Sequence, residues 1–302
     1  MATSNSNYAF SILIINPNTS THMTDALKPI VDRLGYADIH FEYFTAPSKE
    51  SVTLPDGRII HGIPSIDSGE DSAKSALHCK PFVQPLVSKY DGFLVACYSA
   101  HPLVSILKDE IRKFEEGESS SGTTTTAAAR SSRKFVTGIF EASVVTSLSM
   151  ISSFHFLNER ELKKAQARDT FGIVSTGNVW KDELGKAVNE MMIGAGFSQQ
   201  GGHTDRFAGV ETTGLTAIEL HQTPPDIVRQ RIIEATQKLV KEVAPHPVSA
   251  ICMGCAGMAG MEEAVRQGCI EAYGTQRGKG VRIIDGVVAG AGLLVSACKA
   301  GF

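Results

Sequence analysis

The sequence predicts an α/β protein of two pseudo-symmetric domains, each with a parallel sheet flanked by helices. Short apolar runs that end in polar loops alternate with helical patterns, which is typical of βαβ units. This arrangement occurs twice. Asn16 and Thr176 each follow a first strand, and Cys97 and Cys255 each follow a later strand at a similar separation. The chain has 302 residues, which is enough for two domains.

The composition excludes several classes of protein. Hydrophobic residues make up 42% of the chain and charged residues 20%, as in soluble globular proteins. A formal net charge of −3 favours neither nucleic acid nor an anionic membrane as a partner. No apolar run reaches the ~20 residues of a membrane-spanning helix, and no secretion signal is recognised. We expect a cytoplasmic protein with a small-molecule substrate, and we leave a homo-oligomer open as its assembly.

In the first half, residues 10–15 form a continuous apolar and β-branched run, as a strand buried on both faces does. Asparagine and proline then favour a turn, and a threonine or serine can cap a helix over residues 21–34. A second strand is expected at 93–97, followed by a loop and a helix at 103–114.

The second half repeats this order. A strand at 171–174 precedes a helix from about residue 181, and a strand at 250–255 precedes a helix that ends near residue 267. Ligands of open α/β sheets bind at the carboxyl ends of the strands, and all these loops follow such ends.

This pattern predicts one domain of residues 1–139 with 285–302 and another of residues 140–284, with the active site in the cleft between them. Two segments interrupt the first domain. Residues 115–133 are low in complexity, and we expect a flexible insertion there. Residues 47–71 are polar, and we expect a connecting loop there more than a lid.

The chain has six cysteines, which we expect to be free thiols. Cys97 and Cys255 each end a strand beside the next helix, where backbone N–H groups and the helix dipole favour a thiolate. Cysteine is also a common buried residue, so either one alone fits a structural role equally well. Their equivalent positions in a repeated unit favour a functional pair.

Cys252 and Cys255 form a C-x-x-C motif, but residues three apart on a strand point to opposite faces. No second pair completes a zinc site. We therefore expect Cys252 in the core and no metal. Nucleotide-binding motifs and a G-x-S-x-G elbow are also missing, so neither a nucleotide cofactor nor that kind of serine nucleophile is expected. Structural positions in helices are expected for Cys79, Cys269 and Cys298.

His101 lies four residues after Cys97 in the same loop. It could polarise a substrate oxygen or raise the thiolate fraction of Cys97, and a hydrogen-bonded loop histidine fits equally well. No partner is visible in the sequence for His22, His61, His203 and His221.

Four short motifs follow one another along the chain at residues 14–19 (Ile-Ile-Asn-Pro-Asn-Thr), 97–103 (Cys-Tyr-Ser-Ala-His-Pro-Leu), 138–142 (Gly-Ile-Phe-Glu-Ala) and 254–258 (Gly-Cys-Ala-Gly-Met). Together they resemble the Asp/Glu/hydantoin racemase superfamily, and most of all its hydantoin and allantoin racemase branch with its fungal members. The resemblance covers residues 10–290. It implies two pseudo-symmetric α/β domains, a cleft between them and cofactor-independent chemistry.

The resemblance makes Cys97 and Cys255 the catalytic pair, one from each domain. The loop after Cys97 departs from the Gly-Asp-Pro-like loop of many bacterial hydantoin racemases, and the segments at 47–71 and 115–133 are extra. These departures bear on which substrate the protein takes, and they do not affect the expected fold. The residues expected to hold substrate polar groups are Asn16, Ser99, Thr176, Ala256 and Gly257, with His101 added from its place in the loop.

Inversion of a stereocentre next to a carbonyl needs a base on one face and an acid on the other. Two thiols can fill these roles, so we expect a racemase of a 5-substituted hydantoin or an allantoin-like compound. The backbone N–H groups of residues 98–101 and 256–258 are candidate donors to the enolate oxygen. An amino-acid zwitterion would need a charged clamp, which these loops lack. Alternatives are a maleate-type isomerase, a malonate decarboxylase, an amino-acid racemase and a non-catalytic ligand-binding homologue.

Overall fold

The computed structural model describes residues 8–120, 133–158, 163–166, 168–194 and 204–302. The chain divides into two compact units, Met1–Ile139 with Val287–Phe302, and Phe140–Gly286. The C-terminal part of the first unit therefore begins slightly later than the expected residue 285. Within the described ranges, no helix combines the length and the apolar character needed to cross a bilayer.

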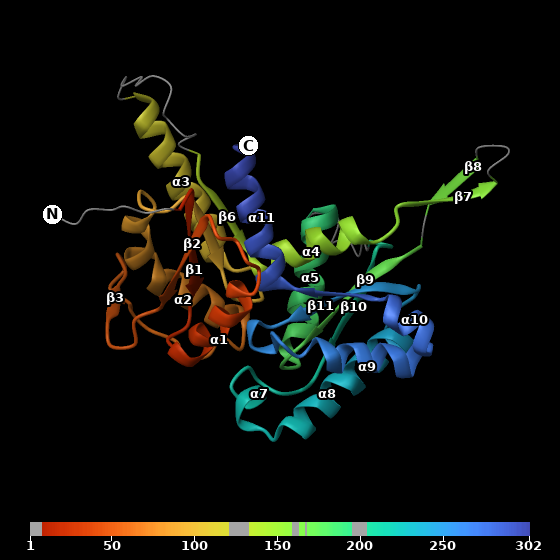
Figure 1. Cartoon of the computed structure of the whole chain (residues 1–302). Helices are drawn as coiled ribbons and strands as arrows, with labels where there is room; N and C mark the ends of the chain where they lie inside the picture. The colour runs from red at the N-terminus through yellow and green to blue at the C-terminus, as the bar shows by residue number, and fades with distance from the viewer. Residues whose placement is uncertain (1–7, 121–132, 159–162, 167, 195–203) are drawn as a thin grey trace. The chain divides into compact units, whose positions relative to one another are not determined.

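The first unit contains a parallel sheet with the strand order β2-β1-β5-β6, of which Figure 1 labels β1, β2 and β6. Ser20 accepts a hydrogen bond from the N–H of Met23 and caps the first helix, as the sequence predicts. The strands of the sheet are β1 (Phe10–Asn16), β2 (Ile39–Thr45), β5 (Gly92–Val95) and β6 (Phe135–Gly138). The helical segments are α1 (Thr21–Asp32), α2 (Gly69–Val83), η1 (Gln84–Leu86), α3 (Pro102–Ser120) and α11 (Gly286–Ala300).

The second unit contains a parallel sheet with the order β10-β9-β11-β12. Numbered along the chain within each sheet, both orders read second, first, third, fourth, so the expected pseudo-symmetric α/β fold is confirmed. The strands are β9 (Thr170–Ser175), β10 (Phe207–Thr212), β11 (Val248–Gly254) and β12 (Arg282–Asp285). The helical segments are α4 (Ile139–Met150), α5 (Val179–Ile193), α7 (Glu219–Gln222), α8 (Pro225–Lys238), η2 (Leu239–Val243), η3 (Ala256–Met258), α9 (Glu262–Tyr273) and α10 (Thr275–Gly280).

Two antiparallel hairpins lie outside these sheets. One joins β3 (Ser51–Thr53) to β4 (Ile59–His61), and the other joins β7 (Phe154–Asn158) to β8 (Lys163–Gln166). The expectation of a plain connecting loop at 47–71 was therefore wrong. The short strands alternate only briefly, so the sequence pattern there resembles a polar loop.

The segment at 47–71 is attached to the rest of the first unit by hydrogen bonds. The carbonyl of Ile63 accepts the N–H of Thr19, at 2.8 Å, in the loop after β1. The Nε2 atom of His78 on α2 lies 3.0 Å from the carbonyl oxygen of Glu50. The hairpin is thereby tied both to α2 and to a strand-end loop.

The expected insertion at 115–133 begins as helix, because α3 continues to Ser120. Residues 115–120 are thus a correction to that expectation. Residues 121–132 lie outside the described part of the chain.

Each unit has its own apolar core. In the first, Leu13, Phe93 and Leu107 are almost fully buried between the sheet and its helices. Gly290 of α11 packs so closely against Leu94 of β5 that a Cβ atom would have no room, so α11 belongs to this core. In the second, Ile251 and Met253 of β11 pack with helix residues such as Ile232, Leu239 and Val265.

Candidate active site

The strand ends of each sheet bring the predicted residues into two separate groups. In the first unit β1 and β5 are adjacent and parallel, so the loops that follow Asn16 and Val95 leave the same edge of the sheet. In the second unit β9 and β11 are adjacent in the same way, and Thr176 and Cys255 follow them. The topology thus pairs Asn16 with Cys97 and Thr176 with Cys255.

Cys97 lies in a tight loop just after β5. Its side chain is half-buried and packs against the core of the first unit. Its Sγ atom lies 3.5 Å from the hydroxyl oxygen of Ser99. The N–H of Ser99 donates to the carbonyl of Cys97 at 3.1 Å, and the N–H of His101 donates to the carbonyl of Ser99 at 2.7 Å. These successive short-range bonds fold the loop so that Ser99 faces the thiol.

Helix α2 holds this loop by two side-chain contacts. The hydroxyl of Ser72 lies 3.2 Å from that of Ser99, and the hydroxyl of Ser75 lies 2.9 Å from Nε2 of His101. All four side chains are buried, with exposures of 4% or less. The loop with Cys97 is therefore anchored to a helix that precedes it in the chain.

The hydrogen bonds of His101 define its protonation. Its Nδ1 atom accepts the N–H of Leu103 at 3.2 Å, so the ring proton lies on Nε2 and is donated to Ser75. Burial lowers the pKa of His101 to about 3, which keeps the ring neutral. Both ring nitrogens of His101 are used inside the first unit, and the expected contact of His101 with substrate stays a prediction. The ring holds the loop in place.

Asn16 is also engaged internally. Its amide nitrogen lies 3.0 Å from acceptors on Asn18, Ser20 and Thr24, and its Oδ1 atom accepts the N–H of Asn18. The side chain is 2% exposed. A buried amide with these partners organises the loop between β1 and α1, and the expected contact of Asn16 with substrate stays a prediction.

Cys255 has a different environment. It directly follows β11, is half-buried and precedes the short helix η3. Its Sγ atom accepts the backbone N–H of Gly257 at 3.3 Å. The donor therefore comes from the backbone of its own loop, as the sequence predicts for a strand-end thiol.

Two backbone donors remain open in the cysteine loops. Among the described residues, the N–H groups of Ala100 and Ala256 have no hydrogen-bond acceptor, and both groups lie within three residues of a candidate thiol. Gly257 by contrast already donates to Cys255. Thr176 is 2% exposed, and its carbonyl accepts the N–H of Gly214 at 3.1 Å.

His221 was not recognised from the sequence. A Cβ atom on Gly257 would lie 3.1 Å from Nε2 of His221 and 3.5 Å from Sγ of Cys255. The imidazole and the thiol thus flank the same small residue. The absence of a side chain at Gly257 allows this approach. Only the fold could reveal it, because α7 and η3 are far apart in the sequence.

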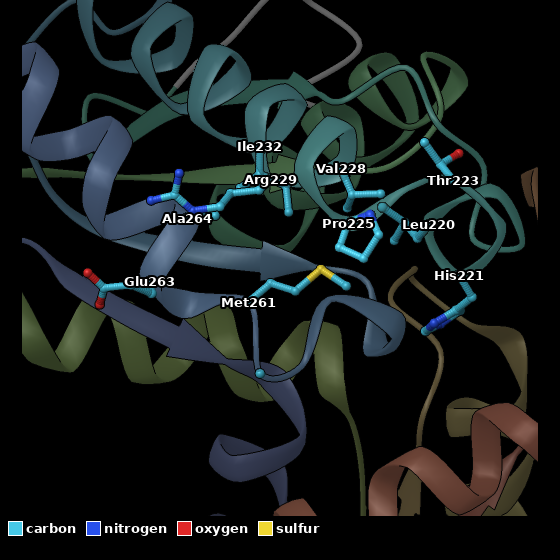
Figure 2. A pocket seen from close by; sticks show the side chains of 11 residues that line it. Leu220, His221, Thr223, Pro225, Val228, Arg229, Ile232, Met261, Glu263 and Ala264 are labelled. Carbon is cyan, nitrogen blue, oxygen red and sulfur yellow. The ribbon is translucent and has the colours of Figure 1, made fainter.

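His221 also lines a cavity of ≈ 420 Å³ in the second unit. Figure 2 shows this cavity between the first turns of α8 and Met261, with His221 on one side of the view and Glu263 on the other. Val228 and Ile232 give it an apolar wall. His221 lines the cavity and also lies beside Gly257. The cavity therefore adjoins the Cys255 loop.

The other cysteines are placed as structural residues. Cys252 on β11 is fully buried, and its Sγ lies 3.0 Å from the hydroxyl of Ser147. Burial raises the pKa of Cys79 and Cys269 to about 12 and that of Cys298 to about 11. These thiols are therefore protonated at neutral pH. In the ranges that the structure covers, no group of three His, Cys, Asp or Glu side chains is arranged to hold a metal ion.

A family model and a relative from yeast each match most of the chain. The sequence model described as Asp/Glu/hydantoin racemase matches residues 12–113 and 120–294. An uncharacterised protein of Schizosaccharomyces pombe is 27% identical over 94% of this chain and 90% of its own.

Two solved structures are similar in fold. One is an allantoin racemase of Klebsiella pneumoniae, with a TM-score of 0.60, 20% identity and coverage of 97% of this chain and 89% of that one. The other is an allantoin racemase of Pseudomonas fluorescens, with a TM-score of 0.61, 19% identity and coverage of 97% and 92%.

Proposed function

The chain belongs to the Asp/Glu/hydantoin racemase family, and on this premise we propose that it is a cofactor-independent racemase of a 5-substituted hydantoin or an allantoin-like compound. Cys97 and Cys255 are the two acid–base groups of this proposal. One observation carries it above all. Each unit has a half-buried cysteine after the third strand of its four-stranded sheet, with a hydrogen-bonding group at the sulfur. This group is Ser99 in one unit and the Gly257 N–H in the other.

The proposed reaction needs no redox step. One thiolate takes the proton from C5 of the ring, and the bonding electron pair moves into the adjacent carbonyl to give an enolate. The other thiol then delivers its proton to C5 from the opposite face. The product is the mirror-image ring, and the two sulfur atoms have exchanged protonation states. The reverse reaction uses the same groups in exchanged roles.

The enolate oxygen needs donors that are in place before charge develops. The open N–H groups of Ala100 and Ala256 are the donors that we propose for ring carbonyls. They replace the broader set of loop N–H groups that the sequence suggested, because Ser99, His101 and Gly257 already donate within their loops.

A neutral ring fits the strand-end loops better than an amino acid does. Residues 16–20, 97–101, 175–178 and 255–258 contain no lysine or arginine. A zwitterionic amino acid carries a carboxylate that binding sites usually meet with a cationic side chain. A hydantoin ring has only neutral carbonyl and N–H groups, which serine hydroxyls and backbone groups can satisfy. The names of the two similar solved structures support the same substrate class.

The proposal is tested with enantiopure 5-substituted hydantoins and allantoin in heavy water. A racemase makes the optical rotation decay to zero, with one deuterium incorporated at C5 of the inverted product. Decay with these compounds and no added cofactor is the expected result. No decay and no deuterium uptake with any of them, combined with turnover of maleate, a malonate or an amino acid, would replace this proposal by another family reaction.

A further inference from the structure

A chain of hydroxyl groups leads from α2 to the thiol of Cys97. The Ser72 hydroxyl lies 3.2 Å from the carbonyl oxygen of Ser68 and 3.2 Å from the hydroxyl of Ser99. The Ser99 hydroxyl lies in turn 3.5 Å from Sγ of Cys97. Between Ser72 and Ser99, and between Ser99 and Cys97, either atom can be the donor. The direction of these hydrogen bonds is therefore free to change without movement of heavier atoms.

The direction depends on the protonation of Cys97. A protonated thiol is a donor to Ser99, so Ser99 donates to Ser72, and Ser72 donates to the carbonyl of Ser68. A thiolate is only an acceptor, so Ser99 donates to the sulfur and Ser72 donates to Ser99. The carbonyl of Ser68 keeps the backbone N–H of Ser72 at 3.0 Å in both cases. Reversal therefore leaves no buried polar group without a partner.

We propose that Ser72 is a positioning residue for the acid–base chemistry of Cys97, because it lets Ser99 exchange donor and acceptor roles as the thiol loses and regains its proton. This inference rests on the proposed function, in which Cys97 passes through both states in each catalytic cycle. Ser72 accepts the hydrogen of Ser99 while Cys97 is protonated, and it donates to Ser99 while Cys97 is a thiolate.

The second contact of α2 with the loop cannot reverse in this way. Nδ1 of His101 accepts the N–H of Leu103, so Nε2 is the donor to Ser75. The Ser75 hydroxyl donates in turn to the carbonyl of Ser72 at 3.0 Å. The two serines are one helical turn apart, and both are buried. Ser75 thus provides a matched control that is outside the reversible chain.

Two ionisable side chains beside the Cys97 loop keep one protonation state near neutral pH. His101 is neutral, with its pKa lowered to about 3 by burial, and Cys79 is protonated, with its pKa raised to about 12. The carboxylate of Asp71 accepts the Ser68 hydroxyl at 2.9 Å at the start of α2. All of these groups stay in place in the variants below. The ionisable side chains of α2 and of the loop are Glu70, Asp71, Lys74, His78, Cys79, Lys80, Tyr98 and His101.

The test is the rate of alkylation of Cys97 by iodoacetamide as a function of pH, measured on the full chain by mass spectrometry of the Cys97 peptide. Ser99→Ala removes a donor to the thiolate, so the midpoint of the pH profile should rise by about one unit. Ser72→Ala removes the acceptor of the Ser99 O–H in the protonated state and a donor to the Ser99 oxygen in the thiolate state. The first loss costs more, because a buried O–H without an acceptor must turn toward sulfur, whereas in the thiolate state the Ser99 hydroxyl still keeps its hydrogen bond to sulfur. The midpoint should therefore fall, by about half a unit.

Ser75→Ala should lower the melting temperature and leave the midpoint unchanged, because it weakens the anchor and not the reversible chain. Ser72→Cys, whose thiol is a weak donor and acceptor, is a second variant that should also lower the midpoint. A midpoint at or above that of the wild type in either folded Ser72 variant would overturn the inference. Shifts of the same size in Ser75→Ala would overturn it as well.

Alkylation requires no turnover, so this test is independent of the racemase assay. If the midpoint falls in Ser72→Ala and rises in Ser99→Ala, but the protein does not racemise hydantoins, the hydroxyl chain is supported and the proposed function is refuted. If the protein racemises hydantoins but the midpoint moves in the same direction in both variants, the proposed function is supported and the role of Ser72 is refuted.

Discussion

The two cysteine loops occupy equivalent places in the two sheets but surround the sulfur atoms by different means. Cys97 faces the side-chain hydroxyl of Ser99, which a second serine on α2 supports. Cys255 accepts a backbone N–H from Gly257 in its own loop. A side-chain donor can be removed by one substitution, whereas a backbone N–H remains after every substitution except proline. Equal topology has therefore not produced equal surroundings of the two sulfur atoms, and only at Cys97 can the hydrogen-bonding group be removed by truncating a side chain.

The histidines near the two cysteine loops also differ, in burial and in surroundings. His101 is 2% exposed and neutral, and it uses both ring nitrogens to hold the Cys97 loop. His221 is exposed and lies beside Gly257, at the edge of the cavity in the second unit. The first histidine is part of the internal framework. The second is placed where it can meet a ligand of the Cys255 loop.

The largest effect is expected from removal of either thiol, which tests whether the two loops are equally necessary. Cys97→Ser and Cys255→Ser should each lower the racemisation rate by about 10³-fold or more, because each face of C5 needs its own proton carrier. Each variant should still exchange the C5 proton of the single enantiomer that faces its remaining thiol. Polarimetry and deuterium exchange on separate enantiomers measure this. Racemisation at the wild-type rate in either variant would contradict the two-thiol mechanism.

A second prediction separates the loop cysteines from the helix cysteines. At pH 8 a thiol with a pKa of about 12 is ionised to about one part in 10⁴, and Cys79 and Cys269 are also buried. Iodoacetamide should therefore modify Cys97 and Cys255 at least about 100-fold faster than these two. Substrate should protect the loop cysteines. Peptide mass spectrometry over time provides the rates, and inactivation that follows labelling of Cys79 or Cys269 would move the site elsewhere.

The buried histidine should make stability depend on pH. The pKa of His101 is lowered from 6.5 to about 3 in the folded state, so below pH 6.5 the unfolded chain binds a proton that the folded chain does not. The unfolding free energy is therefore highest above pH 6.5 and falls as the pH drops, by up to about 1.4 kcal/mol per unit for this group. His101→Asn should be less stable at pH 8 and show a flatter curve between pH 6 and 4. Urea unfolding of both proteins measures the difference, and parallel curves would show that His101 is not buried in neutral form.

The smallest effect is expected at Cys252, which is the neighbour of Cys255 on the same strand. Cys252→Ser should reduce the unfolding free energy by about 1 kcal/mol, because a hydroxyl is costlier to bury than a thiol although Ser147 can accept or donate to it. The rate of turnover per folded molecule should stay near the wild-type value. A loss of turnover as large as that of Cys255→Ser would show that both cysteines of the C-x-x-C motif act together.

The sheets and the cysteine positions could be predicted from the sequence because they depend on local patterns. The buried run at residues 10–15 and the strand before Cys255 are continuous stretches of apolar side chains, and the repeat of their order predicted the pseudo-symmetry. The hairpin of β3 and β4 could not be predicted, because three-residue strands carry too little alternation.

The polar residues around the cysteines were harder to predict. Asn16 and His101 have the side chains expected of a binding site, but their hydrogen-bond partners depend on how α1 and α2 pack against the loops. Ser72 and His221 were missed for the same reason, since each meets its cysteine loop only in the folded unit.

The path of the chain through the two units has a consequence for biosynthesis. The first unit is interrupted, because it contains Met1–Ile139 and is completed only by Val287–Phe302, whereas the second is one continuous stretch. Gly290 of α11 packs directly against Leu94 of β5, so the first core remains open until α11 has been translated. We therefore expect the second unit to fold first on the ribosome, and the first unit to fold only after α11 has been made. This order is the reverse of the usual one, in which N-terminal domains fold first during synthesis.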